Sequence, residues 1–379
     1  MAKIVVDNSE DTRLRIELGK RADPEARRIE RFLSLPDLSR TAGSPIHEVV
    51  ERVTALPDFK GFDFIEVPDI VPADISFDLF DFPAEHPARS KSDTYYVDSK
   101  NILRTHTTVM WYYYLQNEDV RKRMEAGESV GCFSFGKVYR KDEIDRNHMN
   151  IFHQIDAWYL TPKDKKVIDL EVLEQALRSV AKAVFGPDAK LKIFPDTFPY
   201  TDPSLQMEVD KKGKWLEVLG SGVVKGSVLE KFGIDSSKWN GWAFGFGIER
   251  LAMISMELPD IRLFWSDDER VKKQMKLGIK FKEVSKYPEV TRDISFVVKN
   301  DFIPNDYFDL IREIGGELVE QVSLLDKYEN AEKFGTGKIS YTYRTIYRSM
   351  ERTLESKEID ALHAKIEEET RKQFEAEIR

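Results

Sequence analysis

The spacing of apolar residues divides the chain into three stretches. Residues 1–45 are mostly polar, with a helix-like segment over 23–35 that ends in a loop rich in proline and glycine. From Ile46 onward the apolar residues recur at helical spacing. We therefore expect an N-terminal arm over 1–45, attached to the main domain as an appendage.

The next stretch, 46–275, predicts the main domain. Apolar spacing predicts a helix from Ile46, a strand over 62–71 and a helix over 169–184. Several short strands with few crossover helices favour an antiparallel sheet over a parallel one. Further strands are expected over 93–97, 133–140, 151–160, 190–194, 205–209 and 214–219.

A basic linker over 272–286 introduces a second domain, expected over 276–379. Its predicted elements follow the order strand, helix, strand, strand, helix, strand, which is the ferredoxin-like split βαβ arrangement. The chain as a whole is therefore expected to be an α+β protein. The predicted elements are strand 293–298, helix 307–314, strands 320–328 and 338–347, helix 356–371 and strand 374–378.

Composition narrows the class of protein. With 379 residues, 41% hydrophobic and 33% charged, the chain can bury a large core, and no apolar run is long enough to span a membrane. The single cysteine, Cys132, excludes a disulfide framework and a multi-cysteine metal site. The net charge of −9 means that a nucleic acid would have to use local basic patches. Acidic and basic residues mix over 1–20, unlike a signal or transit peptide, so a cytoplasmic location is expected, or an organellar matrix if a leader was removed.

Candidate chemistry is densest over the predicted strand 151–160. Side chains alternate along a strand, so Phe152, Gln154 and Asp156 share one face, while the other face is apolar. An aromatic ring can stack on a base, and a carboxylate can hold an ammonium group. This face is therefore a candidate site for a nucleotide together with an amino acid.

The strand before it contributes further polar groups. Arg140 and Asp142 are expected to share a face there, and His148 lies in the loop that joins the two strands. A guanidinium can hold a phosphate through two hydrogen bonds. The alternative is a solvated hairpin with ordinary salt bridges.

A glycine-punctuated strand over 241–247 runs into a helix that begins at Ile248. Glycines let a ligand lie close to the backbone, and Arg250 in the first helical turn adds a positive charge where the helix dipole already favours anions. This predicts a triphosphate site, with close helix packing and a structural ion pair as the alternative. The sequence contains neither a P-loop nor a dinucleotide-binding glycine motif.

Two shorter segments complete the candidate site. Phe198 and Tyr200 flank a proline and can wall a flat apolar substrate, and Glu217 on a strand can bind Mg²⁺ beside phosphates. Taken separately, the aromatics also suit core packing and Glu217 also suits an ordinary surface carboxylate.

Read together, these segments resemble the three signature motifs of the class II aminoacyl-tRNA synthetases and, within them, the phenylalanyl-tRNA synthetase family. A catalytic domain followed by this second module resembles the single-chain, organellar type, whose C-terminal ferredoxin-fold domain binds the anticodon. The segments that carry the resemblance are 80–96, 103–107, 140–154, 198–204, 215–222, 241–253 and 259–264, with 287–296 and 343–354 in the second domain.

The resemblance implies a two-step reaction. The carboxylate of phenylalanine attacks the α-phosphorus of ATP, pyrophosphate leaves, and the aminoacyl group passes to the terminal 2′-hydroxyl of tRNA(Phe). ATP and Mg²⁺ are the implied cofactors, and a single-chain enzyme is consistent with a monomer. Such chemistry requires positioning and charge neutralisation more than covalent catalysis.

The resemblance also assigns roles around ATP. Arg140 would hold the α-phosphate and the attacking carboxylate, Arg250 the γ-phosphate and His148 the β- and γ-phosphates. Phe152 would stack on adenine and Glu217 would bind Mg²⁺. In the second domain Arg344 and Arg348 are expected on one strand face, as contacts to the tRNA backbone, with a solvated charged face as the alternative.

Around the amino acid, the resemblance places Phe198 and Tyr200 against the side chain and Ala243 at the end of its slot. The chain departs from the family at several of these positions, notably Trp111 and Tyr200, while the phosphate and adenine positions match. A paralogue for another amino acid, or a catalytically silent RNA-binding or regulatory protein, are therefore the alternatives. The implied amino-acid-binding residues are His106, Thr108, Trp111, Asp142, Gln154, Asp156, Phe198, Tyr200, Ser221 and Ala243.

Overall fold

We describe a computed structural model of the chain, which covers residues 3–283 and 287–379. The end of the linker predicted over 272–286 lies outside these residues. The chain forms two compact units, which we describe separately. Unit 1 comprises Met1–Arg140, Ile151–Leu258 and Met275–Lys280, and unit 2 comprises Lys141–Asn150, Pro259–Gln274 and Phe281–Arg379.

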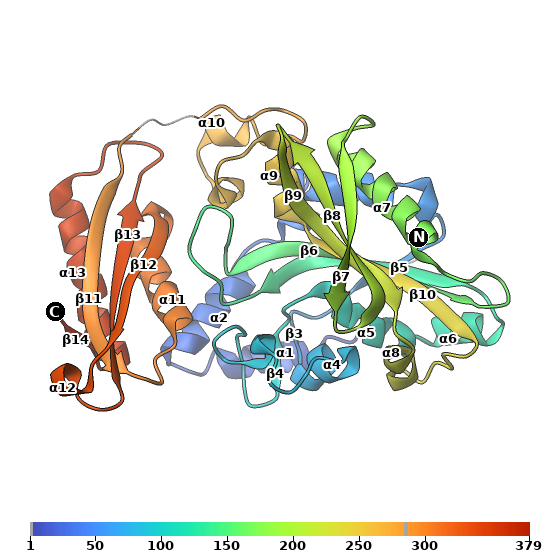
Figure 1. The fold of residues 1–379 in the computed structure, drawn as a ribbon, viewed down its shortest axis with the longest axis horizontal. Helices are drawn as coiled ribbons and strands as arrows, with labels where there is room; N and C mark the ends of the chain where they lie inside the picture. Colours follow the sequence, from blue (N-terminus) through green and yellow to red (C-terminus); the bar gives the residue numbers. More distant parts are fainter. Residues whose placement is uncertain (1–2, 284–286) are drawn as a thin grey trace. The chain divides into compact units, whose positions relative to one another are not determined.

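Unit 1 is built on an eight-stranded sheet of order β1-β2-β5-β6-β10-β9-β8-β7, of which the strands β5 to β10 are labelled in Figure 1. From β5 to β7 every neighbouring pair is antiparallel, as the sequence predicts, whereas β1 pairs with β2, and β2 with β5, in parallel. The strands are β1 Lys3–Val5, β2 Asp63–Glu66, β5 Val130–Tyr139, β6 Ile151–Pro162, β7 Leu191–Phe198, β8 Thr201–Lys211, β9 Lys214–Val224 and β10 Trp239–Gly247.

Three helices pack against one another and against this sheet: α3 (Pro45–Thr54), α7 (Leu170–Phe185) and α9 (Ile248–Met256). The helix α7 begins where the Asp169 side chain accepts a hydrogen bond from the Val172 N–H, an N-cap. A separate apolar cluster, which includes Trp111, Trp158 and Ala243, packs in unit 1 with the helices α4 (Ala73–Phe77), α5 (Met110–Gln116), α6 (Glu118–Glu125) and α8 (Gly226–Lys231).

The N-terminal residues pack into unit 1 and do not form the appendage that the polar sequence indicates. The strand β1 extends the sheet, and the helices α1 (Ser9–Leu18) and α2 (Pro24–Ser34) bury Leu14, Leu18 and Phe32 in one cluster with Tyr95. The ammonium of Lys137 on β5 donates to the carbonyl oxygens of Leu33 (3.1 Å) and Leu35 (2.7 Å), at the end of α2. Because only a few apolar residues make these contacts, periodicity alone does not reveal them.

Two predicted strands differ from the structure. The strand expected over 62–71 is divided into β2 and β3 (Ile70–Pro72), with Pro68 between them. A proline has no N–H to donate to a sheet, which fits a break at this point. The strand β3 pairs with β4 (Asn101–Leu103), and the segment 93–97 contributes only an isolated bridge between Tyr96 and Ile102.

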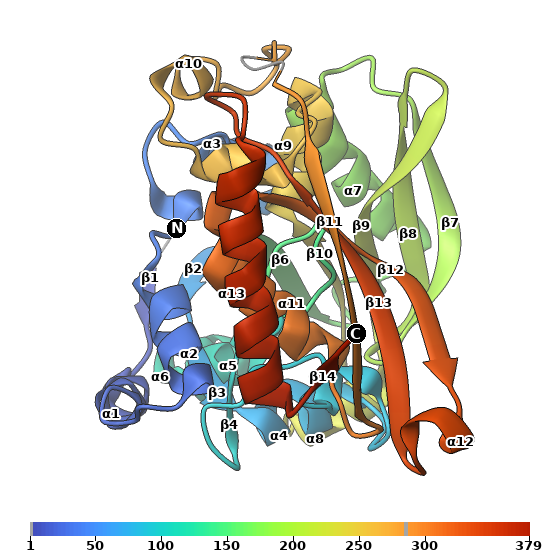
Figure 2. The ribbon, with the colours of Figure 1, turned by 90° about the vertical axis from the view of Figure 1, so that its left-hand side faces the viewer.

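Unit 2 contains the predicted βαββαβ order in a sheet of order β12-β13-β11-β14, with antiparallel neighbours (Figure 2). The helices α11 and α13 pack against each other and against strands of this sheet, around Phe296, Tyr307 and Tyr343. The elements are β11 Val290–Lys299, α11 Pro304–Gly315, β12 Val319–Glu329, α12 Ala331–Phe334, β13 Lys338–Tyr347, α13 Ser356–Phe374 and β14 Glu377–Ile378.

Two segments from earlier in the chain also belong to unit 2. The side chain of Ile144 is buried in its core, and the Val322 N–H donates to the Ile144 carbonyl at 3.1 Å. The segment 259–274 carries the short helix α10 (Glu269–Lys272). In the described part of the chain, no helix is both long and apolar enough to cross a membrane.

Candidate active site

The sheet of unit 1 places the predicted side chains in register. Gln154 on β6 lies opposite Gly136 and Gly247, and Asp156 lies opposite Ser134 and Gly245. Residues that pair directly share a face, so one face of the sheet carries Gln154 and Asp156 beside glycines of β10. The alternation predicted for this strand is therefore present.

The glycines on β10 leave the room that these side chains occupy. A Cβ atom at Gly245 would lie 2.0 Å from the Oδ1 atom of Asp156. A Cβ atom at Gly247 would lie 3.8 Å from the ring of Phe152, which is an ordinary contact. Gly245 is thus required by the position of the carboxylate, whereas a Cβ atom at Gly247 would fit beside the Phe152 ring.

Asp156 is a buried carboxylate, 4% exposed, held by two hydroxyl groups. The hydroxyl of Thr107 donates to its Oδ2 atom, and that of Thr108 donates to Oδ1 at 3.3 Å. Burial raises the pKa of Asp156 to about 7, while the two threonines and the charge of Arg140 act in the opposite direction. A ligand with an ammonium group would stabilise the ionised form.

His106, which precedes Thr107 in the chain, is buried and neutral. Its Nε2 atom donates to the carbonyl of Ser76 at 3.1 Å. Burial and the charge of Arg140 lower the pKa of His106 to about 3. Its Nδ1 atom therefore carries a lone pair, and among the described residues this atom has no hydrogen-bond partner.

Aromatic rings surround the predicted side-chain slot. Phe80 meets Trp111 and Tyr200 edge to face, with ring centroids 5.2 Å and 5.8 Å away, and Tyr200 lies 6.5 Å from Phe198. Trp111 also stacks on Trp158 at 4.5 Å. These rings form an aromatic wall against which an aromatic side chain could pack.

The end of this wall lies on β6 and β10, where Trp158 pairs with Ala243 in the ladder. Both Trp111 and Trp158 have a buried indole N–H without a partner in the described structure. Phe80, Thr107 and Trp158 are not among the residues predicted for the site. Trp158 follows Asp156 by two residues on the same strand, so strand alternation could have indicated it.

The candidate phosphate and adenine groups lie at strand ends. The guanidinium of Arg140, just after β5, lies 5.1 Å from the ring centroid of Phe152, and its Nε atom donates to the Thr105 carbonyl at 2.9 Å. Arg250 is exposed in the first turn of α9, and its Nη1 atom lies 3.5 Å from the Glu217 carbonyl oxygen. Both arginines can therefore reach a ligand outside the sheet.

Glu217 has a second carboxylate opposite it. In the ladder of β8 and β9 it pairs with Glu208, beside a register shift. Glu217 is exposed and Glu208 half-buried, and within residues 3–283 and 287–379 neither forms an ion pair. Two carboxylates free of cations are the oxygen ligands that Mg²⁺ prefers, so this pair fits the metal predicted for Glu217. Glu208 is not among the residues predicted for the site, because the register of β8 and β9, with its shift beside Glu208, decides which residue lies opposite Glu217.

Comparison with known proteins agrees with this geometry. The family model for the class II core domain of tRNA synthetases matches residues 30–275, and that for the ferredoxin-fold anticodon-binding domain matches 285–379. The chain is 39% identical to the chloroplastic/mitochondrial phenylalanine–tRNA ligase of Arabidopsis thaliana, over 83% of this chain and 72% of that protein. The chain belongs to the phenylalanine–tRNA ligase family of class II synthetases.

Other relatives extend this picture. The mitochondrial phenylalanine–tRNA ligase of Mus musculus is 35% identical, over 82% of this chain and 74% of that protein. A crystal structure of pyrrolysyl-tRNA synthetase from Desulfitobacterium hafniense is 21% identical, with a TM-score of 0.45, over 68% of this chain and 82% of that one. The names of the phenylalanine–tRNA ligases do not favour a silent protein or a paralogue for another amino acid.

Ser221, which is predicted for the amino-acid site of this synthetase, lies elsewhere. Ser221 pairs with Phe244 in the ladder, on the face opposite to Ala243. Its hydroxyl donates to the Leu205 carbonyl at 3.1 Å. The structure therefore does not bring Ser221 to the candidate site, because its strand position points it to the other face.

Asp142 and His148 belong to the segment 141–150 of unit 2. The strand β5 ends at Tyr139, so Asp142 does not share a strand face with Arg140 as predicted. The Nδ1 atom of His148 lies 2.9 Å from an Asp145 carboxylate oxygen. That carboxylate orients the imidazole ring of His148.

The predicted tRNA contacts of the synthetase are ion-paired within unit 2. Arg344 forms two hydrogen bonds of 2.7 Å with Asp293 across β13 and β11. Arg348 lies past the end of β13, so the two arginines do not share one strand. Its Nε atom donates at 2.5 Å to the buried carboxylate of Glu320.

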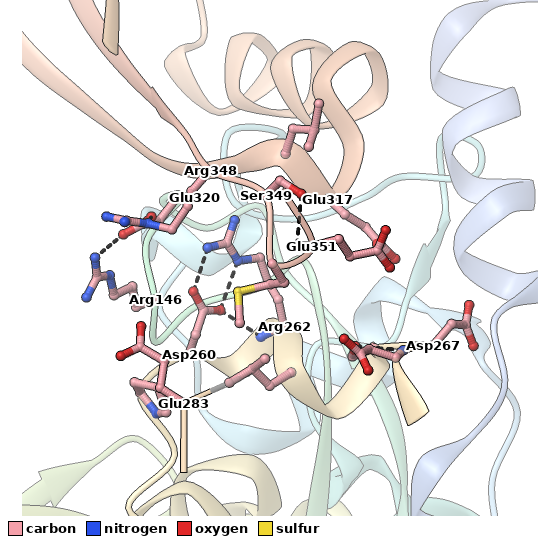
Figure 3. A pocket seen from close by; sticks show the side chains of 16 residues that line it. Arg146, Asp260, Arg262, Asp267, Glu283, Glu317, Glu320, Arg348, Ser349 and Glu351 are labelled. Carbon is pink, nitrogen blue, oxygen red and sulfur yellow. Dashed lines mark hydrogen bonds and ion pairs between the residues drawn. The ribbon is translucent and has the colours of Figure 1, made fainter. Parts of the chain in front are cut away.

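Arg348 and Glu320 line a pocket of about 360 Å³ within unit 2 (Figure 3). Arg146 pairs with the same Glu320, and Arg262 pairs with Asp260 at 2.5 Å. The arginines lower the pKa of Glu320. Each of these arginines already has a carboxylate partner, so an anionic ligand in this pocket would have to displace an ion pair.

Proposed function

We propose that this chain activates phenylalanine with ATP and transfers it to tRNA(Phe) through an aminoacyl-adenylate. The observation that carries the proposal is the buried carboxylate of Asp156, which lies on the sheet face that also carries Phe152 and Gln154. The family to which the chain belongs supports the same assignment.

The amino-acid end of the site accounts for the substrate. The carboxylate of Asp156 would accept hydrogen bonds from the ammonium group, with Thr107 and Thr108 holding it in place. The side chain of the amino acid would pack against the aromatic wall of Phe80 and Tyr200. An α-amino acid with an aromatic side chain satisfies both halves of this site.

The nucleotide end accounts for the chemistry. Phe152 would stack on adenine, and Arg140, which lies against that ring, would hold the α-phosphate and the attacking carboxylate. Arg250 would hold the γ-phosphate in the departing pyrophosphate. Fixed positive charges placed where negative charge develops stabilise such a transition state without covalent catalysis.

Mg²⁺ would be held by Glu217 together with Glu208. When bound, the ion would neutralise part of the charge on the phosphate oxygens. His148, oriented by Asp145, is proposed to contact the β- and γ-phosphates.

The ferredoxin-fold domain is proposed to bind the anticodon region of tRNA(Phe), with Arg344 and Arg348 as backbone contacts. A single chain with both domains fits a monomeric enzyme. The two phenylalanine–tRNA ligases named above are mitochondrial or chloroplastic, which supports an organellar matrix for this chain. The cytoplasmic location expected from the sequence stays a prediction.

The test is exchange of labelled pyrophosphate into ATP by the full chain, measured with each of the twenty amino acids separately. We expect exchange with phenylalanine and at least tenfold less with tyrosine, followed by charging of tRNA(Phe). Exchange with another amino acid alone would contradict the substrate. Absence of exchange with all twenty would contradict the enzyme assignment.

A further inference from the structure

A buried imidazole and a buried carboxylate meet on the sheet face away from the substrates. His153 on β6 is 0% exposed and Glu249 in the first turn of α9 is 2% exposed. The Nδ1 atom of His153 lies 2.6 Å from the Oε1 atom of Glu249. The backbone N–H of His153 also donates to both carboxylate oxygens, at 2.9 Å and 2.8 Å.

The hydrogen bond at Nε2 of His153 shows which of the two ring nitrogens carries the proton. The backbone N–H of Leu38 donates to Nε2 at 2.9 Å, so this nitrogen is an acceptor. The proton is therefore on Nδ1, which donates to Glu249. A carboxylate that accepts from one ring N–H and one backbone N–H is held in a single orientation.

The segment that supplies Leu38 is itself firmly held. The carboxylate of Asp37 accepts from the Ser39 N–H at 2.9 Å, and its Oδ1 atom lies 3.4 Å from the Nε2 atom of His153. Arg40 donates to the Phe135 carbonyl at 2.8 Å and lies 4.6 Å from the centroid of that ring. The turn 37–40 is thus anchored on β5, next to the strand that carries His153.

Of the residues beside this pair in sequence, Phe152 and Arg250 are assigned to ATP and Gln154 is assigned to the amino acid. Phe152 and Gln154 flank His153 on β6 and point to the opposite face, and Arg250 follows Glu249 on α9. The pair therefore joins the strand that presents the adenine-stacking ring to the helix turn that presents the γ-phosphate arginine. A helix turn that shifted along β6 would move Arg250 relative to Phe152.

We propose that His153 is a positioning residue for ATP: its Nδ1–H bond to Glu249 sets the distance between Phe152 and Arg250. This rests on the proposed function, because it assigns both of these residues to one bound nucleotide. The groups that hold the amino acid, Asp156 and Thr107, have no hydrogen bond to the pair. Loss of the bond should therefore affect ATP and leave phenylalanine binding nearly unchanged.

Two substitutions separate the two ring nitrogens. In His153→Asn the side-chain amide reaches the place of Nδ1 and can still donate to Glu249. In His153→Gln the amide reaches the place of Nε2, so it keeps the contact to Leu38 but loses the bond to Glu249. His363→Gln is a matched control, since His363 is a buried histidine of unit 2 whose Nε2 atom lies 3.2 Å from the Asp293 carbonyl.

The measurements are ATP affinity of the full chain by calorimetry, KM for ATP and for phenylalanine in pyrophosphate exchange, and thermal unfolding. We expect His153→Gln to weaken ATP binding and raise KM for ATP by roughly tenfold or more, since small misplacements of a binding group have effects of this size. KM for phenylalanine should stay within about twofold. His153→Asn and His363→Gln should keep ATP affinity near that of the wild type.

A purely structural role predicts a different pattern. Equal loss of ATP affinity in His153→Asn and His153→Gln, or a parallel rise of both KM values, would overturn the proposal. If the wild type and His153→Gln bind ATP equally well, the positioning role of His153 would be overturned, while the proposed function would stand. A wild-type chain that neither binds ATP nor supports exchange would overturn the proposed function as well.

Discussion

The hydroxyl of Thr107 donates a hydrogen bond to the carboxylate of Asp156, a residue 49 positions later in the chain. The contact joins the segment before α5 to the middle of β6, and it holds a carboxylate that burial would otherwise keep protonated. The site thus maintains a carboxyl group whose charge is sensitive to its neighbours near neutral pH.

Thr107→Val removes this donor while keeping the shape of the side chain. The hydrogen bond lowers the pKa of Asp156, so its loss should raise that pKa above the value of about 7. Binding of the ammonium group needs the ionised carboxylate, so kcat/KM for phenylalanine should rise with pH through about 7 in the wild type and at higher pH in the variant. The pH profile of exchange measures both, and coincident profiles would contradict the role of Thr107.

Asp156→Asn should abolish activity and yet stabilise the fold at alkaline pH. The folded pKa of about 7 exceeds the ordinary value of 3.8, so the unfolded chain releases this proton first as pH rises. As the pH rises from 3.8 to about 7, the free energy of unfolding of the wild type should therefore decrease by up to about 4 kcal/mol, and above this range it should stay constant. Urea unfolding at pH 5 and at pH 8 measures this change, and the free energy of unfolding should decrease less between the two pH values in the variant than in the wild type. An equal decrease in both proteins would contradict the raised pKa of Asp156.

Gly245→Ala should impair phenylalanine activation because the added Cβ atom would lie 2.0 Å from the Asp156 carboxylate. We expect kcat/KM for phenylalanine to fall by about 10² or more, as for a binding group displaced by about an ångström. Gly247→Ala is the control, since its Cβ atom would make an ordinary 3.8 Å contact with Phe152. Similar losses in the two variants would show that the position of Asp156 is not the cause.

Glu208→Gln and Glu217→Gln should each raise the Mg²⁺ concentration that gives half-maximal exchange, because each removes one charged oxygen ligand. We expect an increase of roughly tenfold for either carboxylate. Glu171→Gln on the exposed side of α7 leaves the pair intact and serves as control. An unchanged Mg²⁺ dependence in Glu208→Gln would assign the metal to Glu217 without its ladder partner.

Arg344→Ala and Arg348→Ala should differ in how they affect charging of tRNA. The Arg344 pair is exposed, so its loss should change stability little while weakening tRNA binding and its salt dependence. Arg348 pairs with the buried Glu320, so its loss should destabilise unit 2 by about 2 kcal/mol or more. Filter binding at several salt concentrations and thermal unfolding of both variants measure these effects. Unchanged tRNA binding in Arg344→Ala would favour the alternative, in which Arg344 belongs to a solvated charged face and does not contact tRNA.

Alternation and order of elements allowed much of this fold to be predicted from sequence. The face of Phe152, Gln154 and Asp156 follows from a period of two, and the βαββαβ order follows from the apolar pattern of the second domain. The packing of 1–45 could not be predicted, since its contacts depend on a few buried residues such as Phe32 and on the distant Lys137.

The site was harder to predict where register decides the position of a side chain. Ser221 lies on the wrong face and Glu208 lies opposite Glu217 because of the pairing of β8, β9 and β10, which no local pattern specifies. Thr107 and His153 act through partners far away in sequence. The boundaries expected at 45 and 275 stay predictions.

The burial of Ile144 in the core of unit 2 has a consequence for dissecting the enzyme. A fragment that ends near residue 275 contains the whole span of the class II core model but lacks β11, α11 and β12, against which this segment packs. It would expose Ile144, separate Asn150 from Asp309 and leave the Lys141 ammonium without Asp306. The residues that the class II core model matches, 30–275, are therefore not the same residues that form the compact unit 1. For this reason, substitutions in the intact chain test the two domains more cleanly than removing either of them.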